Sequence, residues 1–438
     1  MSQPISQLTS EVPVGDGRGG GATRGVVACV ESLAAEAGAE MLRRGGNATD
    51  AAVATAFAQG VVDPIYCGIA GGFHGIFHDA ERQATNVISA GGRAPLAASD
   101  SMWTLVGRRG ALWEVEGNRN RLGYEASMVP GFIRGAAEAL SRFGSGRVAW
   151  RDVIEPAIAL AEEGFVVYPY LYRLWMPRTE RMRNFLESLD GPAVLGHTQA
   201  CSEIYLHTDG SVYEIGETLV QRDYAATLRR LAESGPDDFY EGEIARQIAE
   251  DFERNGGLLS LEDLERYQPE IGPPISTTFH DLTVLTEPAP TIGAVTLEIL
   301  NVLEGWDLGE LGWNSAPYLD RLARAFHVAF RDRMTQLGDP DFVDVPEQKL
   351  LSKEYAAQLR EQIERELESN GAGTVGDSVA DRQPSAAETT HVSVLDTAGN
   401  AAAITHSLGM SSGVVTKGLG FQHNCHMVMF DPSPGTRN

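Results

Sequence analysis

The chain has 438 residues, of which 43% are hydrophobic and 22% charged, a composition typical of an ordinary globular protein. Its length is enough for a large hydrophobic core and would suit two or three domains. The net charge is −25, from 60 acidic against 35 basic residues, and such a surface repels phosphate backbones and anionic lipid. Neither nucleic acid nor a membrane is therefore expected as a partner.

The first 22 residues are polar and rich in glycine, which predicts a flexible N-terminal arm. They lack a basic start followed by an apolar run, so no signal peptide is expected, and no stretch is apolar for long enough to cross a bilayer. The cysteines are scattered without a Cys-x-x-Cys spacing, at Cys29, Cys67, Cys201 and Cys425. This pattern favours reduced thiols and a cytoplasmic location.

Two helices are predicted between residues 32 and 64. Ser32 can cap the first helix, and the glycine pair 45–46 can end it. Asn47 or Thr49 can begin the second, which is rich in alanine on most faces and is therefore expected to be buried.

The next elements follow from turn and cap residues. Residues 68–90 predict a β-hairpin whose glycines allow close approach of the backbone. A helical region is expected over roughly 130–260, with a cap in "SLEDLERY". Strands are predicted in 276–286, then a helix in 294–305, then an exposed loop over 369–388. No repeat and no shift in composition marks a boundary, so the sequence predicts one domain with strands at both ends and helices between.

A second hairpin is predicted near the end of the sequence, with strands at 389–395 and 401–408. If Asp396 pairs with Asn400, the loop is 397–399, which places a glycine where a left-handed conformation is needed. The turn chemistry thus predicts the register of the two strands.

That register brings four polar side chains together. It sets Thr389 opposite Ser407 and His391 opposite Thr405, and all four project from one face of the hairpin. A slip of one residue would send half of them to the other face. A threonine hydroxyl needs a nearby base, and cutting the preceding peptide bond, Glu388–Thr389, would supply one as the new α-amino group. An ordinary threonine-rich edge strand is the alternative that the chemistry alone leaves open.

Several segments follow one another in a fixed order from about Thr23 to the last residue. They are "AAEAGAEMLRRGGNATDAAVATAFAQGVVDP", "GIAGGFHGIF", "VPGFIRGAAEAL", "EPAIALAEEGF", "NGGLLSLEDLERY", "LGDPDF" and "TTHVSVLDTAGNAAAITHSLG". In this order they resemble γ-glutamyltranspeptidases, which are N-terminal-nucleophile hydrolases. The resemblance implies an α+β fold, the four-layer αββα sandwich. It also implies one precursor that cuts itself, so that 23–388 belong to the large subunit and 389–438 begin the small subunit of the same domain.

The resemblance also implies the roles of single residues. Thr389 would be the nucleophile, first attacking the Glu388 carbonyl and later the substrate, with its freed amine as general base. Thr405 matches a position that orients the nucleophile, and Ser407 keeps a hydroxyl where the family has threonine. The implied substrate is a small-molecule acyl amide, and the chemistry requires no cofactor. The sequence leaves open whether the paired subunits form a homodimer.

Departures from the family pattern concern substrate binding. Gly91 stands where the family has the arginine that holds the substrate α-carboxylate, while Arg93, two residues later, would face the same way on a strand and suits a carboxylate ligand. Asn424 matches a family asparagine, but Met429 replaces the aspartate that receives the substrate amine, and Gly409 replaces another asparagine. Each lost charge-assisted contact is worth about 1.5–3 kcal/mol. The acyl group can therefore be γ-glutamyl or a less zwitterionic one.

Two further observations qualify the resemblance. The segment 423–426, "HNCH", raises the question of a metal, but on a strand its ligands would not converge, so no metal site is expected. Family chains continue past the last residue here, through a segment that supplies oxyanion contacts. The alternative function is therefore an uncleaved, inactive relative that binds a small acid or a partner subunit.

Overall fold

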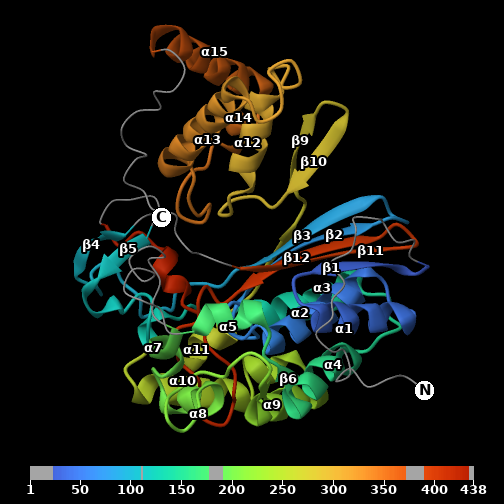
Figure 1. The fold of residues 1–438 in the computed structure, drawn as a ribbon, viewed down its shortest axis with the longest axis vertical. Coiled ribbons are helices and arrows are strands. Elements are labelled where there is room, and N and C mark those ends of the chain that lie inside the picture. Colours follow the sequence, from blue (N-terminus) through green and yellow to red (C-terminus); the bar gives the residue numbers. More distant parts are fainter. Residues whose placement is uncertain (1–22, 110–111, 177–190, 371–388, 434–438) are drawn as a thin grey trace. The chain divides into compact units, whose positions relative to one another are not determined.

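The computed structural model describes residues 23–109, 112–176, 191–370 and 389–433 (Figure 1). The predicted arm 1–22, Glu388 and most of the predicted loop 369–388 lie outside the described residues. The chain divides into two compact units, where the sequence predicted one domain. The first unit takes in Met1–Gly272 and Gln383–Pro432, and the second takes in Pro273–Arg382 and Ser433–Asn438.

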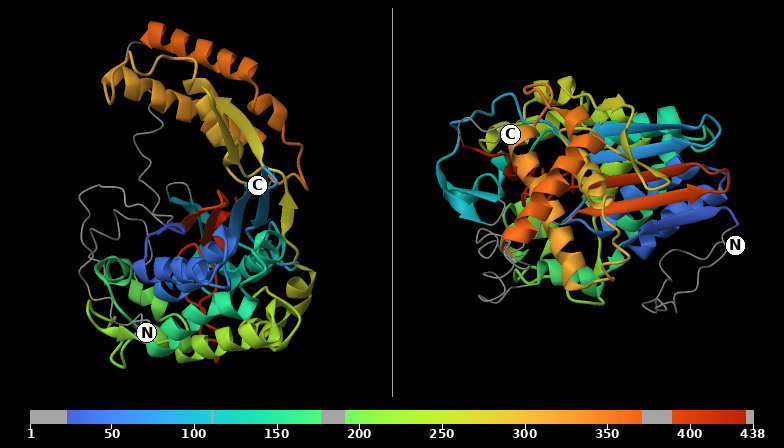
Figure 2. Two further views of the ribbon diagram at one scale, coloured as in Figure 1. Left: turned by 90° about the vertical axis from the view of Figure 1, so that its right-hand side faces the viewer. Right: turned by 90° about the horizontal axis from the view of Figure 1, so that it is seen from above.

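The first unit is built on a six-stranded antiparallel sheet (Figures 1 and 2). Its strand order is β1-β11-β12-β2-β3-β8, which places the hairpin from the end of the sequence between strands from its beginning. The strands are β1 Gly25–Cys29, β11 Thr390–Asp396, β12 Ala401–Ser407, β2 Gly72–Asp79, β3 Ala84–Ala90 and β8 Glu270–Gly272. The predicted cut before Thr389 therefore falls inside one unit, since both of its sides contribute strands to one sheet.

The hairpin β11–β12 has the predicted register. The backbone N–H of Asp396 donates to the Asn400 carbonyl at 3.0 Å, and Gly399 has a φ of 90° in the loop between them. His391 lies opposite Thr405, as predicted. Burial alternates along both strands, so the predicted polar side chains share one face, and the opposite face is buried.

Helices cover that buried face of the sheet: α1 Ser32–Arg43, α2 Ala48–Val62 and α3 Phe132–Phe143 (Figure 1). All fifteen residues of α2 are buried, as predicted for most of its faces. Asn47, one of the two predicted starts, caps it in a reciprocal capping box with Asp50. The predicted Ser32 cap is wrong by one residue. The N-cap is Glu31, whose backbone is extended, and Ser32 is already helical.

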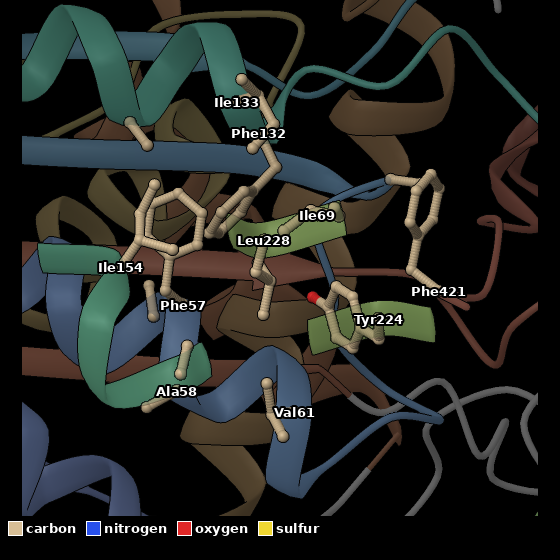
Figure 3. Packing of buried hydrophobic residues seen from close by; sticks show 14 of the residues in the cluster. Phe57, Ala58, Val61, Ile69, Phe132, Ile133, Ile154, Tyr224, Leu228 and Phe421 are labelled. Carbon is tan, nitrogen blue, oxygen red and sulfur yellow. The ribbon is translucent and has the colours of Figure 1, made fainter. Parts of the chain in front are cut away.

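Further helices pack beneath these. They include α4 Trp150–Glu163, which contacts α2, and α9 Arg222–Ser234, which contacts α4. Figure 3 shows the core between these layers, where the Phe57 ring meets the Phe132 ring edge-on with centroids 5.1 Å apart. The remaining elements of this unit are β4 Leu105–Arg109, β5 Leu112–Val115, η2 Glu116–Asn118, η3 Tyr124–Ala126, β6 Phe165–Val166, α5 Pro169–Trp175, α7 Gly191–Leu195, α8 Gln199–Tyr205, β7 Thr218–Leu219, η4 Pro236–Phe239, α10 Glu243–Arg254, α11 Leu261–Arg266 and η5 His426–Met429.

The second unit combines a two-stranded sheet with helices around a core of its own. Its elements are β9 Ile275–Phe279, β10 Leu282–Thr286, α12 Gly293–Leu303, α13 Ala316–Gln336, α14 Glu347–Leu350 and α15 Lys353–Asn370. The predicted strands and helix of this region are confirmed. Each unit thus pairs a sheet with helices, as the predicted α+β class requires. Within the described residues, no helix is long and apolar enough to span a membrane.

Candidate active site

Thr389 lies at the end of the hairpin opposite its loop, immediately before β11. Its side chain is exposed, and its hydroxyl donates to the backbone carbonyl of His406 at 3.3 Å. The residue is therefore exposed as a whole, while its hydroxyl is anchored to the first paired residues of the hairpin.

His391 organises the hydroxyls next to Thr389. Its Nδ1 lies 2.7 Å from the Thr405 hydroxyl, and its Nε2 lies 2.9 Å from the Ser393 hydroxyl. Burial lowers the pKa of His391, which favours a neutral ring that donates at one nitrogen and accepts at the other. In this arrangement the Thr405 hydroxyl is held by His391.

Ser407 adds a further hydroxyl on the same face of the sheet. Its hydroxyl oxygen accepts from the Gly409 N–H at 2.8 Å, which leaves the hydroxyl proton available to another acceptor. Ser407 pairs with Gly72, and a Cβ on Gly72 would lie 2.7 Å from the Gly91 carbonyl oxygen. The positions of Ser407 and Gly91 thus lie at one end of the same sheet, with only a glycine between them.

The Asn424 side chain is fully used inside the protein. It is 0% exposed; its amide nitrogen donates to the carbonyls of Ala70 and Met128, and its oxygen accepts from the N–H groups of Met128 and His426. An asparagine side chain has two donors and two acceptor sites, so this set fills all four. The asparagine thus holds together the three chain segments that contain Ala70, Met128 and His426.

Arg93 does not lie on a strand, so that part of the prediction is wrong. The strand β3 ends at Ala90, and the glycine pair 91–92 breaks the alternation before Arg93. Its guanidinium forms an ion pair with Glu270 at 2.6 Å, and the Arg93 side chain is 44% exposed.

Packing explains two of the departures from the family pattern. A Cβ on Gly91 would lie 2.6 Å from the His74 Nε2, and a Cβ on Gly409 would lie 2.8 Å from the Cys425 sulfur. Neither position has room for a side chain unless its neighbour moves. Met429, in place of an aspartate, is 71% exposed.

The segment 423–426 is not a strand, which corrects the geometry assumed above. His423 is buried, with its Nε2 3.1 Å from the Thr416 hydroxyl, and His426 begins η5. Burial lowers the pKa of His423 to about 3 and that of His426 to about 4, so both rings are neutral at neutral pH. Across the part of the chain that is described, no three His, Cys, Asp or Glu side chains gather as metal ligands would.

The sequence analysis did not predict a buried group of polar side chains behind Thr389. It consists of Glu31, Gln59, Thr390 and His406, which lie on the helix side of the sheet. The available signal was Gln59, a long polar side chain within the alanine-rich stretch predicted to be buried.

Comparison with known proteins gives one family. The model of the gamma-glutamyltranspeptidase family matches residues 34–438. The acylase ACY 1 proenzyme of Pseudomonas sp. strain SE83 is 36% identical over 422 residues, which cover 94% of this chain and 71% of that protein. The glutathione hydrolase proenzyme of Escherichia coli K12 is 32% identical over 424 residues, covering 95% of this chain and 68% of that protein.

Solved structures agree with the sequence comparison. The cephalosporin acylase of Bacillus halodurans superposes with a TM-score of 0.77 at 27% identity, covering 98% of this chain and 75% of that one. The Helicobacter pylori gamma-glutamyltranspeptidase gives 0.69 at 29% identity, covering 79% and 93%. The predicted N-terminal-nucleophile hydrolase fold is thereby confirmed, and the protein is an amide hydrolase or acyltransferase. The chain belongs to the gamma-glutamyltranspeptidase family.

Proposed function

We propose that this protein cuts its own chain between Glu388 and Thr389 and then uses Thr389 as an N-terminal nucleophile on an acyl amide. The observation that carries the proposal is the position of Thr389 in the fold. It is the exposed residue directly before a hairpin whose register is fixed, with its hydroxyl on the His406 carbonyl. The hydroxyl is thus held at a defined position, as a nucleophile must be.

The reaction follows from the groups on Thr389. Its hydroxyl oxygen attacks the amide carbonyl, and its α-amino group, freed by the cut, accepts the hydroxyl proton. The same amino group returns the proton to the departing amine as the C–N bond breaks, which leaves an acyl ester on Thr389. Water or an amine then attacks this ester and releases the acyl group. The residues require no cofactor for these steps.

The contacts of the other residues implied by the resemblance indicate which of them are available to the substrate. Ser407 is best placed to touch the substrate, because its hydroxyl keeps a free donor on the face of the sheet opposite the helices. Thr405 would act with His391, which it contacts. Asn424 and Arg93 already have protein partners, and each would have to exchange one of them for the substrate.

The site favours an acyl group that is less zwitterionic than γ-glutamyl. Gly91 leaves no side chain to bind a substrate carboxylate, and the His74 ring occupies the adjacent space. Met429 offers no carboxylate to a substrate amine. Two of the four similar proteins described above are named acylases and one is named a glutathione hydrolase, so the acyl preference needs its own measurement.

The first experiment is the intact mass of the purified protein under denaturing conditions, beside Thr389→Ala. Two fragments that divide between Glu388 and Thr389 are expected for the wild type, and one chain for the variant. A wild type that stays uncut would refute the proposal and favour an inactive binding protein.

The acyl preference is measured on the cleaved protein. A γ-glutamyl anilide and neutral acyl anilides are compared by kcat/KM, with Thr389→Ala as the blank. Faster turnover of the neutral anilides is expected. Turnover of the γ-glutamyl anilide alone would exclude the acylase version.

A further inference from the structure

Gln59 is a polar residue in a helix that is otherwise packed on every side. The side chain is 0% exposed, in α2, whose fifteen residues are all buried. A buried amide is costly unless it is hydrogen-bonded, by roughly 1–3 kcal/mol in proteins. Its contacts therefore indicate why this helix carries a glutamine among alanines and valines.

The amide of Gln59 bridges the two strands of the hairpin. Its nitrogen donates to the Thr390 hydroxyl at 2.8 Å, and its oxygen lies 3.0 Å from the His406 Nε2, which donates to it. Thr390 and His406 are directly paired across β11 and β12. One side chain from the helix layer thus joins both members of the first strand pair.

This pair holds Thr389 in two ways. Thr390 is the next residue along the chain, and the His406 carbonyl accepts the hydrogen bond from the Thr389 hydroxyl. A movement of either residue would therefore move the hydroxyl of Thr389.

The orientation of the amide is itself fixed. The Gln59 nitrogen also donates to the Glu31 carboxylate at 2.8 Å, so both of its hydrogens are used and its oxygen must face His406. His406 is buried, and its Nδ1 has no hydrogen-bond partner, so the ring proton belongs on Nε2. The four side chains form a network with one consistent donor pattern.

The far end of the hairpin is tied to the same helix. The carboxylate of Asp396 accepts from the N–H of Ala48, the first residue of α2, at 3.1 Å. Asp396 therefore attaches the loop of the hairpin to α2, and Gln59 attaches the opposite end of the hairpin, next to Thr389, to the same helix. A rigid helix with two attachment points gives the hairpin little freedom to shift.

We propose that Gln59 is a positioning residue for Thr389, acting through Thr390 and His406. The inference rests on the proposed role of Thr389 as nucleophile and adds a group that touches neither substrate nor nucleophile. A misplacement of about 1 Å at a reacting atom can cost roughly 100-fold in rate. A network that holds both Thr390 and His406 can therefore affect the rate without touching the substrate.

The test compares Gln59→Leu with a matched control, Gln221→Leu. Gln221 is also 0% exposed and also holds two buried groups, the Tyr205 hydroxyl at 2.9 Å and the Val61 carbonyl at 2.8 Å, away from the hairpin. Both variants lose a buried amide, so both should be less stable. Only Gln59→Leu is expected to slow self-cleavage and to lower kcat, by roughly 10- to 100-fold with little change in KM. Rates are measured below the melting temperature of each protein.

A second variant covers the case in which Gln59→Leu does not fold. Thr390→Val removes the hydroxyl at almost the same shape and is expected to lower kcat in the same direction. The double variant Gln59→Leu/Thr390→Val should be no slower than Gln59→Leu alone, because the two act as one unit. Wild-type kcat and cleavage in Thr390→Val, and in Gln59→Leu where it folds, would overturn the inference.

The state of His406 gives a readout that does not depend on activity. Nitrogen-15 NMR of the histidine rings, in the uncleaved Thr389→Ala chain, should show the His406 proton on Nε2, and Gln59→Leu should change that signal. A proton on Nδ1 in the parent chain would overturn the Gln59 contact. A wild type that neither cleaves nor turns over would refute the proposed function separately, whatever the NMR shows.

Discussion

At the scale of single residues, the site is shaped by what its glycines leave room for. Gly91 and His74 exclude each other: a Cβ at position 91 would lie 2.6 Å from the imidazole Nε2. His74 pairs with Ser89 on the neighbouring strand β3. A side chain at position 91 and the imidazole of His74 therefore compete for the same space.

We predict that Gly91→Arg alone does not create activity on a γ-glutamyl anilide. The new side chain should collide with His74 and destabilise the protein by about 1–3 kcal/mol, as overpacking usually does. The pair Gly91→Arg/His74→Ala removes the collision and should raise kcat/KM for the γ-glutamyl anilide above that of the single variant. Steady-state kinetics and urea unfolding of both proteins measure this; a single variant as active as the double one would contradict it.

At the scale of elements, the hairpin loop and the start of α2 depend on one carboxylate. Asp396 accepts from the N–H groups of Ala398 and Asn400 and from the Asn400 side chain, in addition to Ala48. A carboxylate at a helix N-terminus is also favoured by the helix dipole. The loop, the strand and the helix thus share an anchor.

We expect Asp396→Ala to lower the free energy of unfolding by about 3 kcal/mol or more, since hydrogen bonds to a charged group are worth about 1.5–3 kcal/mol each. Asp79 is the matched control. It accepts from the N–H groups of Glu81 and Arg82 in the β2–β3 loop but contacts no helix start there. Asp79→Ala should therefore cost clearly less in urea unfolding. Equal losses would show that the link to α2 contributes nothing.

These elements also show what the sequence could predict. The hairpin register followed from Asp396, Asn400 and a glycine in a three-residue loop. The cap of α2 was narrowed to Asn47 or Thr49, because turns and caps depend on residues that are neighbours in the sequence. The strand order could not be predicted. Cys29 pairs with Val392, more than 300 positions away, and no local pattern carries such a pairing.

The parts of the site that were missed depend on distant contacts in the same way. Gln59 was visible as a polar residue in a buried helix, but its partners come from two other segments of the chain. Arg93 was expected on a strand because alternation was extended through two glycines. The boundary at Gly272 was invisible, because composition does not change there while the packing does.

At the scale of the whole molecule, the first unit carries three buried histidines that resist protonation. Burial lowers the pKa of His406 and His423 to about 3 and that of His426 to about 4, against about 6.5 in an unfolded chain. The unfolded chain therefore binds these protons first, and stability is lost as the pH falls below 6.5. At pH 5.5 each histidine costs about 1.4 kcal/mol. Glu31, whose pKa burial raises, opposes this in part.

The stability of the second unit depends on pH in the opposite direction. Burial, reinforced by the neighbouring Asp332 carboxylate, raises the pKa of Glu298 to about 8, against 4.5 for an unperturbed carboxyl group. Tyr355 donates its hydroxyl proton to Asp332 at 2.5 Å, which keeps that carboxylate beside Glu298. The folded unit therefore holds a proton that the unfolded chain releases. Its stability rises as the pH falls through 8 toward 4.5.

We predict that lowering the pH from 8 to 5.5 destabilises the first unit and stabilises the second. Three histidines at about 1.4 kcal/mol each are a large share of the roughly 5–15 kcal/mol that holds a domain folded, so the effect is measurable. Hydrogen exchange with mass spectrometry, corrected for intrinsic rates, should show protection falling in peptides from β12 and rising in peptides from α12 and α13. Glu298→Gln should remove the rise in the second unit and leave the first unchanged. If both units lose protection together in acid, the histidines do not act within their own unit and the two cores unfold as one.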